Sequence, residues 1–282
     1  MELHAYRDVN KRGTIVRVNY EATAFDGSRW TKYANVYLPY GYDESKPYNI
    51  LYLMHGGGGN PDAWLDCSKI KNALDRGFSE GKAEPFIAVF PTYYSLDPSE
   101  HRTEGPDASW ENEQIRLFQK ELQEDLIPAV EGRFRTFAEN TGLEGLQKSR
   151  QHRAFGGFSM GGGVTWYVFL YHLDIFAAFL PLSGDCWELM PMGGRLASEE
   201  TARVIAERVR AYGFTGKDYK ILGGTGDKDL GLEAMQPMLN AMTADPDLFS
   251  FGDNLFFNVK EDAVHAYEEV YHHIWNYIPQ MF

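Results

Sequence analysis

The sequence alternates between short apolar segments and longer amphipathic segments along most of its length. Near its start, Gly13–Tyr20 and Lys32–Leu38 alternate apolar and polar residues, as strands with one solvent-exposed face do. Two later segments, Tyr48–Met54 and Phe86–Phe90, are continuously apolar, which is typical of strands covered on both faces. The first pair therefore predicts an antiparallel hairpin at the edge of a sheet, and the second pair predicts buried strands.

The remainder of the chain repeats the order of strand and helix. Gln114–Val130 carries an apolar stripe at helical spacing. Further strands are expected at Arg153–Phe158, Phe176–Leu182, Tyr219–Leu222 and Leu255–Val259, and further helices at Thr165–His172, Glu199–Tyr212, Gly231–Met242 and Tyr267–Tyr277. This alternation predicts one α/β domain over residues 1–282. Its mostly parallel sheet has about eight strands, an antiparallel N-terminal edge and helices on both faces.

Composition and charge narrow the choice of partners. A formal net charge of -13 disfavours nucleic acid and anionic membranes as partners, and no apolar run approaches the length of a membrane span. Cys67 and Cys186 form neither a disulfide framework nor a zinc motif. The first ten residues lack the apolar segment of a signal peptide. As written, the chain is expected in the cytoplasm, but a secreted chain trimmed of its leader would begin in the same way, so localisation stays open.

A serine motif lies between a predicted strand and a predicted helix. The segment Gly157–Gly161 (GFSMG) matches G-x-S-x-G, and in this context the pattern is typical of a nucleophile elbow. The serine of such an elbow lies on a strained turn at a helix N-terminus, so the flanking positions must be small. A chain with 28 glycines also produces this pattern by chance, so the position between strand and helix carries the interpretation of Ser159 as a nucleophile.

A glycine-rich loop, Leu53–Asn60 (LMHGGGGN), follows a predicted buried strand. Backbone N–H groups of such a loop stabilise a carbonyl oxygen as it becomes negatively charged. We expect the N–H groups of Met160 and Gly57 to form this oxyanion hole, with Gly58 as the alternative to Gly57. The loop lacks the features of a P-loop or a dinucleotide-binding motif. His55 is expected to pack beneath it.

One of the eight histidines suits the role of general base. In proteins with this elbow, the acid and then the histidine follow the serine along the chain. Four histidines precede Ser159, and His172 lies in the helix directly behind it. His272 and His273 lie within the last predicted helix. His265 lies on the loop between the last strand and that helix, from which it can reach the serine, so we expect it to be the base.

The acid that orients the histidine is expected on the loop after the strand ending at Leu222. Two aspartates lie there, and we favour Asp229 over Asp227. Asp185, which follows the strand ending at Leu182, is a third candidate. It could instead cap the next turn or bind substrate beside Trp187.

Four longer segments share features with one family. They are Asn35–Asp43 (NVYLPYGYD), Tyr48–Asn60 (YNILYLMHGGGGN), His152–Gly162 (HRAFGGFSMGG) and Leu180–Trp187 (LPLSGDCW). Together they resemble the feruloyl esterase modules of bacterial xylanases of the clostridial, cellulosomal xylanase Y type, in the esterase D-like group of α/β-hydrolases. The resemblance runs from about Gly13 to the C-terminus.

The resemblance implies an α/β-hydrolase fold and hydrolysis of ferulate and p-coumarate esters of plant arabinoxylan or its oligosaccharides. It supports Ser159, His265 and Asp229, because a T-G-x-x-D pattern of the family matches Thr225–Asp229. Where the family often carries Trp shortly after the histidine, this chain has Tyr267. No metal or organic cofactor is expected. Acetylxylan esterase or another short-chain carboxylesterase of the same group is the alternative, and the oligomeric state stays open.

A phenolic acid requires a flat apolar slot with a polar group for its ring hydroxyl. Trp187 and Asp185 are the expected substrate-binding residues, because they follow a strand end near Ser159. Tyr93, Tyr94 and Trp110 are candidates for another wall of the slot.

Overall fold

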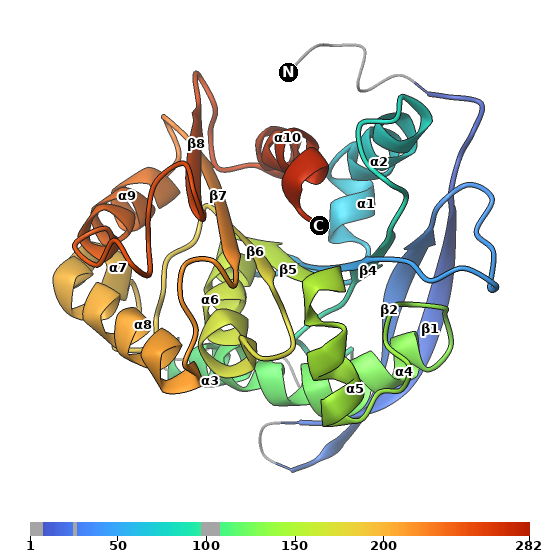
Figure 1. Ribbon diagram of the computed structural model, residues 1–282, viewed down its shortest axis with the longest axis horizontal. Helices are drawn as coiled ribbons and strands as arrows, with labels where there is room; N and C mark the ends of the chain where they lie inside the picture. Colours follow the sequence, from blue (N-terminus) through green and yellow to red (C-terminus); the bar gives the residue numbers. More distant parts are fainter. Residues whose placement is uncertain (1–7, 25–26, 97–107) are drawn as a thin grey trace.

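The computed structural model describes residues 8–24, 27–96 and 108–282, with the backbone alone for residues 108–111. In this part of the chain, eight strands form one sheet in the order β1-β2-β4-β3-β5-β6-β7-β8 (Figure 1). The strands are β1 (Thr14–Thr23), β2 (Arg29–Leu38), β3 (Ile50–Met54), β4 (Ile87–Phe90), β5 (Arg153–Phe158), β6 (Ala178–Leu182), β7 (Lys220–Gly226) and β8 (Leu255–Lys260). Strand β2 runs antiparallel to both β1 and β4, and the other neighbouring strands are parallel. The predicted α/β fold with an antiparallel edge is confirmed.

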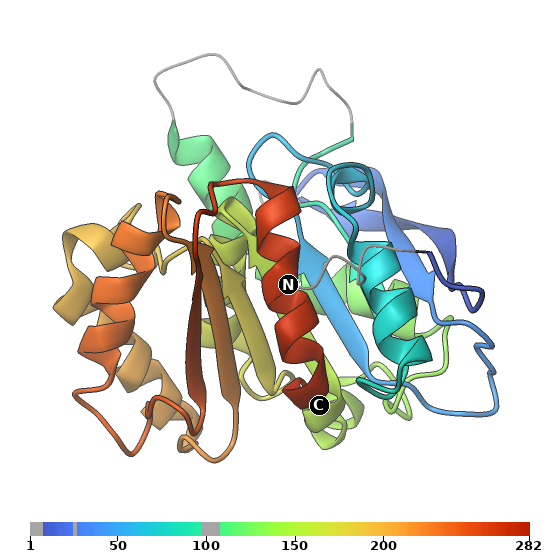
Figure 2. The same ribbon diagram turned by 90° about the horizontal axis from the view of Figure 1, so that it is seen from above.

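Helices cover both faces of the sheet (Figures 1 and 2). On one face lie α1 (Ala63–Asp66), α2 (Ile70–Ser79) and α10 (Tyr267–Tyr277), and on the other α3 (Ala108–Glu121), α4 (Ile127–Glu131), α5 (Leu143–Lys148), α6 (Met160–His172), α8 (Ser198–Tyr212) and α9 (Gly231–Met242). Strand β3 shows why both layers are needed: Ile50 and Tyr52 pack into one core, and Leu51 and Leu53 into the other. Successive side chains of a strand point to opposite faces, so a continuously apolar strand must be covered on both faces of the sheet.

Strand β7 is longer than its sequence predicts. Gly223 to Gly226 were expected in a loop, but they pair with β8 in a parallel ladder. The glycines are required by close neighbours: a Cβ on Gly224 would lie 2.4 Å from the ring of His273, and one on Gly226 would lie 2.1 Å from the carbonyl oxygen of Ala263. The loop that carries the acidic residues therefore begins only at Asp227.

Two helices also differ from the prediction. Helix α6 begins at Met160, directly after the serine, rather than at Thr165. The predicted helix Gln114–Val130 begins earlier and is divided by a π-helical turn, Leu122–Leu126. Pro128 in the following turn lacks an N–H, so the regular hydrogen-bond ladder cannot continue through it. The short helices α1, α2, α5 and α7 (Gly193–Leu196) were not predicted.

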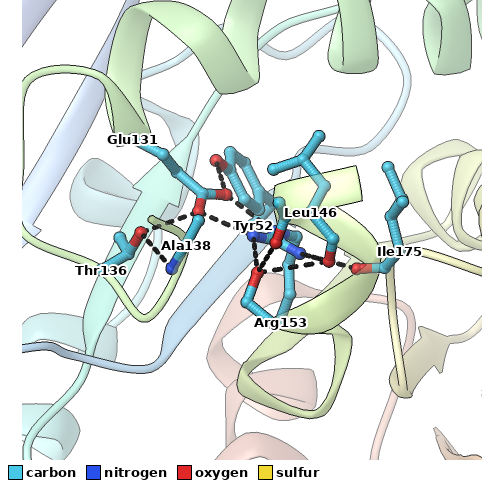
Figure 3. A network of polar contacts seen from close by, with 9 residues as sticks. Tyr52, Glu131, Thr136, Ala138, Leu146, Arg153 and Ile175 are labelled. Atoms are coloured by element: carbon cyan, nitrogen blue, oxygen red, sulfur yellow. Dashed lines mark hydrogen bonds and ion pairs between the residues drawn. The ribbon is translucent and has the colours of Figure 1, made fainter. Parts of the chain in front are cut away.

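A buried ion pair joins the start of β5 to the helix layer (Figure 3). Arg153 is 1% exposed, and its Nε and Nη2 donate to the two carboxylate oxygens of Glu131 at 2.7 and 2.8 Å. Tyr52 and Thr136 also donate to this carboxylate. The guanidinium further reaches the carbonyl oxygens of Leu146 and Ile175 and the hydroxyl of Ser149. The sequence analysis missed this network.

No helix in the described residues is long and apolar enough to span a membrane.

Candidate active site

The loops that follow β3, β5, β6, β7 and β8 meet at one edge of the sheet, because these strands are parallel. Ser159 directly follows β5 and has a φ of 57° and a ψ of -117°, a strained conformation for a residue with a side chain. The glycines on either side permit the turn. A Cβ on Gly157 would lie 2.3 Å from the carbonyl oxygen of Gly161, and one on Gly161 would lie 2.5 Å from that of His55. The backbone therefore makes the strained turn that was expected at Ser159, and the role of this serine as a nucleophile stays a prediction.

Ser159, His265 and Asp229 form a continuous hydrogen-bonded chain across this edge. His265 Nε2 lies 2.9 Å from Ser159 Oγ, and His265 Nδ1 lies 2.7 Å from Asp229 Oδ1. The side chain of Asp229 has no exposed surface, whereas that of His265 is 26% exposed and Ser159 is half-buried. The carboxylate fixes the tautomer that leaves Nε2 free to accept the serine proton.

Hydrogen bonds hold Asp229 in its ionised form. Burial by itself would raise the pKa of this carboxyl, but hydrogen bonds from His265, the Gly231 N–H and the Ser183 hydroxyl outweigh burial and lower it. Ser183 Oγ donates to Asp229 Oδ2 at 2.8 Å, and the Gly231 N–H donates to Oδ1 at 2.7 Å. Asp227 is exposed and accepts instead from the Ala263 N–H at 3.2 Å. Of the two aspartates, only Asp229 contacts His265.

The glycine loop after β3 lies beside the elbow. A Cβ on Gly57 would lie 2.7 Å from Met160 Sδ, so the two expected oxyanion donors are neighbours. The Gly58 N–H donates to the Tyr94 hydroxyl at 3.1 Å, which favours Gly57 over Gly58. The N–H of Met160 lies in the first turn of α6, where backbone N–H groups have no partner within the helix.

His55 packs beneath this loop, as expected. Its Nδ1 donates to the Gly56 carbonyl oxygen at 2.7 Å, and its Nε2 accepts from the Thr92 hydroxyl at 2.7 Å. Burial lowers the pKa of His55 to about 4, so the ring is neutral near pH 7. Tyr93 and Tyr94, the candidates for a further wall of the substrate slot, belong to the core instead. Both are buried, and both pack on the His55 ring.

Asp185 and Trp187 interact with each other. The indole Nε1 of Trp187 donates to Asp185 Oδ1 at 2.7 Å, and the Gly194 N–H at the start of α7 donates to Oδ2 at 2.7 Å. Burial raises the pKa of Asp185 against the lowering effect of these hydrogen bonds. The visible contacts of Asp185 thus orient Trp187 and cap α7, and its direct contact with substrate stays a prediction.

Trp187 lines a cleft of about 420 Å³ between the start of α3 and the segment that precedes α7. The other lining residues are Asn112, Glu113, Arg116, Tyr167, Glu188, Leu189, Met190 and Pro191. Gly184, three residues before Trp187, packs against the elbow, since a Cβ there would lie 2.3 Å from the Ser159 carbonyl oxygen. The segment from Gly184 to Trp187 therefore links the elbow to this cleft, whose lining does not include Ser159 or His265. The side chain of Trp110 lies outside the described part of the structure.

The roles of two residues at the site were missed by the sequence analysis. Ser183 donates a hydrogen bond to Asp229, and the hydroxyl of Tyr267 accepts one from the Gly56 N–H of the glycine loop. Ser183 directly follows the buried strand β6 and has a φ of 51°, so a polar residue just after an apolar strand was the available signal. Nothing in the pattern connects Tyr267 to a loop 211 positions earlier.

Among residues 8–24, 27–96 and 108–282, no group of three or more His, Cys, Asp or Glu side chains is arranged to hold a metal ion.

The order of the site along the chain defines the class of protein. The serine turn follows β5, the carboxylate follows β7 and the histidine follows β8, over a mostly parallel sheet. This is the arrangement of the α/β-hydrolases. The chain belongs to the esterase family, since the family model described as "Putative esterase" matches residues 29–281.

Individual relatives agree with this assignment. The chain is 39% identical over 276 residues to endo-1,4-beta-xylanase Y of Acetivibrio thermocellus, covering 96% of this chain and 23% of the relative. It is 31% identical over 191 residues to the endo-1,4-beta-xylanase/feruloyl esterase of Xylanibacter ruminicola, covering 66% of this chain and 24% of the relative. The chain therefore matches about a quarter of the length of these relatives.

A solved structure extends the similarity to the whole chain. A mutant of the feruloyl esterase module from Clostridium thermocellum, complexed with sinapinate, superposes with a TM-score of 0.86 at 36% identity. The alignment covers 100% of this chain and 92% of that module. The predicted resemblance to feruloyl esterase modules of bacterial xylanases is confirmed.

Proposed function

We propose that this chain is a serine esterase that hydrolyses ferulate and p-coumarate esters of plant arabinoxylan or its oligosaccharides. The observation that carries the proposal is the hydrogen-bonded chain from Ser159 through His265 to Asp229. The acyl specificity is supported by the 36% identical feruloyl esterase module that was solved with sinapinate, a phenolic acid of the same type.

In the proposed mechanism, Ser159 Oγ attacks the ester carbonyl carbon while His265 Nε2 accepts the hydroxyl proton. Asp229 keeps Nδ1 protonated and stabilises the imidazolium that forms. The carbonyl oxygen becomes an oxyanion and accepts hydrogen bonds from the N–H groups of Met160 and Gly57. His265 then gives the proton to the leaving sugar oxygen, and water repeats the two steps to release the acid and free Ser159.

The proposed substrate is a small-molecule or oligosaccharide ester. Trp187 offers a flat apolar face whose orientation is fixed by Asp185, and the cleft beside it has room for a part of the substrate beyond the scissile bond. The net charge of -13 suits a neutral sugar ester better than a polyanion.

The test is release of ferulate from methyl ferulate by the purified protein, with Ser159→Ala and Ser250→Ala measured in parallel. Ser250 lies on the loop before β8, at the opposite edge of the sheet, and its variant controls for a general effect of replacing a serine. We expect release by the wild-type protein and by Ser250→Ala, and a loss of at least about 10⁴-fold in Ser159→Ala.

The outcomes separate the parts of the proposal. Cleavage of p-nitrophenyl acetate without release of ferulate would retain the esterase and replace the feruloyl specificity by a short-chain one. Substantial turnover by Ser159→Ala with either ester would refute Ser159 as the nucleophile.

A further inference from the structure

The glycine loop after β3 forms a tight turn whose N–H groups face different partners. The Gly59 N–H donates to the Gly56 carbonyl oxygen at 3.1 Å, which closes a β-turn over four residues. Gly58, at the third position of the turn, has a φ of +69°, the left-handed region that a type II turn requires there. A loop of consecutive glycines has many accessible conformations, so contacts from outside the loop must select this one.

The Gly56 N–H donates to the hydroxyl of Tyr267 at 2.8 Å. Tyr267 lies two residues after His265, at the start of α10. Its ring packs against those of Phe158 and Trp64, with centroid distances of 4.8 and 5.0 Å. Phe158 directly precedes Ser159 and also packs on the His265 ring. Tyr267 therefore connects the glycine loop to the elbow and to the loop that carries His265.

On the other side of the turn, the Gly58 N–H donates to the hydroxyl of Tyr94 at 3.1 Å. The Tyr94 ring is 8% exposed and stacks on His55 at a centroid distance of 5.7 Å. Rotation of the peptide between Gly57 and Gly58 would turn this N–H away from the hydroxyl. Tyr94 therefore favours one orientation of that peptide.

Between these two contacts, the Gly57 N–H is directed to the site. The Gly56 carbonyl oxygen accepts from both His55 Nδ1 and the Gly59 N–H. Because the peptide bond is planar and trans, the Gly57 N–H points opposite to that carbonyl. Gly57 is exposed and, in the described part of the chain, its N–H has no hydrogen-bond partner. The N–H groups of Gly56, Gly58 and Gly59 are thus hydrogen-bonded within the protein, and the N–H of Gly57 is left for a ligand.

We propose that the hydroxyls of Tyr94 and Tyr267 are positioning groups that hold the glycine loop so that the Gly57 N–H faces the developing oxyanion. The inference rests on the proposed esterase function and deepens it. Tyr267 lies two residues after His265, so this chain holds its oxyanion loop with a hydroxyl from the same segment that carries the general base.

The experiment compares Tyr267→Phe, Tyr94→Phe and the double variant with Tyr277→Phe as the matched control. Tyr277 lies on the same helix as Tyr267 and donates its hydroxyl to the Gly223 carbonyl oxygen at 2.7 Å, so its variant loses a comparable buried hydrogen bond far from the glycine loop. With p-nitrophenyl acetate and methyl ferulate, we expect each active-site variant to lower kcat by about 5- to 50-fold with little change in KM. Tyr277→Phe should stay within about 2-fold of wild type, since it retains the loop.

A second readout isolates the transition state. An arylboronic acid accepts Ser159 Oγ at boron and forms a tetrahedral anion that mimics the intermediate. Its affinity should fall in Tyr267→Phe and Tyr94→Phe by the same factor as kcat/KM, because both quantities report oxyanion stabilisation. Burial raises the pKa of Tyr267 to about 12, so its hydroxyl is neutral throughout, and the shape of the pH profile should not change in Tyr267→Phe.

Unchanged boronate affinity in both tyrosine variants, or a loss no larger than that of Tyr277→Phe, would overturn the proposal. A wild-type protein that cleaves p-nitrophenyl acetate but not methyl ferulate would refute the feruloyl specificity, while the acetate series would still test the tyrosines. If neither ester is cleaved, the proposed esterase function fails, and the boronate affinities of the variants still test whether the two tyrosines position the glycine loop.

Discussion

The two ends of strand β5 carry polar networks of opposite kind. At its start, Arg153 uses all five N–H donors of its guanidinium on Glu131 and other buried acceptors. Just past its end, Ser159 is half-buried, and the nearby Gly57 N–H has no hydrogen-bond partner among the described residues. The Arg153 network is closed, because every N–H donor of the guanidinium has a protein acceptor. The network around Ser159 leaves donors that a substrate can use.

This difference indicates what each network does. Breaking a closed network destabilises the fold, because a missing partner leaves a buried charge or dipole uncompensated. A catalytic network must leave hydrogen-bonding capacity to be filled in the transition state. The number of hydrogen bonds also decreases along the catalytic chain itself. Asp229 accepts hydrogen bonds from His265, Gly231 and Ser183, whereas the hydroxyl of Ser159 contacts only His265 among the described residues.

Replacing Asp229 by Asn should have the largest effect of the four tests that follow. The amide cannot hold Nδ1 of His265 protonated as the carboxylate does, so we expect kcat to fall by about 10³- to 10⁴-fold with little loss of stability. Steady-state hydrolysis of p-nitrophenyl acetate measures the effect. Asp227→Asn is the matched control and should retain nearly full activity. A larger loss of kcat in Asp227→Asn than in Asp229→Asn would show that Asp227, and not Asp229, orients His265.

Breaking the closed network should affect stability instead. Arg153→Met leaves the Glu131 carboxylate buried without its cation, which is expected to lower the free energy of unfolding by about 3–5 kcal/mol. Urea denaturation followed by fluorescence measures the change, and kcat of the folded fraction should stay within about 3-fold of wild type. The double variant Arg153→Met/Glu131→Gln should regain part of the stability. A large loss of kcat at unchanged stability would show that the two ends of β5 are not separate in function.

Acid should destabilise the fold by protonating buried histidines. Burial lowers the pKa of His55, His172 and His273 to about 4, below the value of about 6.5 for an unfolded chain. The unfolded state therefore binds protons that the folded state does not, and stability falls as pH decreases from about 6.5 to 4. At pH 5 each of these groups costs up to about 2 kcal/mol of unfolding free energy.

Urea denaturation at pH 7 and pH 5 measures this dependence. His172→Gln removes one of the buried rings away from the site and should flatten the pH dependence between these values. Equal stability of the wild-type protein at both pH values would contradict the expected shift.

Ser183→Ala should have the smallest effect. It removes one of the hydrogen bonds to Asp229 and leaves those from His265 and Gly231, so the carboxylate stays in place and kcat should fall by only about 5-fold. The same assay with p-nitrophenyl acetate measures it. A loss as large as that of Asp229→Asn would mean that the carboxylate depends on Ser183 for its position.

Much of the fold was predictable because strands and helices have their own periodicities. The eight expected strands all occur in the described structure, within a few residues of their predicted bounds. The exceptions have local causes that a pattern does not contain. Gly223 to Gly226 continue β7 because His273 and Ala263 pack against them, and a π-helical turn precedes Pro128.

The sequence by itself determined the elbow, the glycine loop and the order in which serine, acid and histidine follow one another, since these depend on residue type and on neighbours along the chain. The sequence favoured Asp229 over Asp227, but only the tertiary structure showed the contact with His265, because Asp229 is buried against it whereas Asp227 is exposed. It alone joined Glu131 to Arg153, 22 residues apart, and Gly56 to Tyr267, 211 residues apart. Such contacts have no sequence signal because a hydrogen bond depends on distance in space, which the periodicity of a chain does not encode.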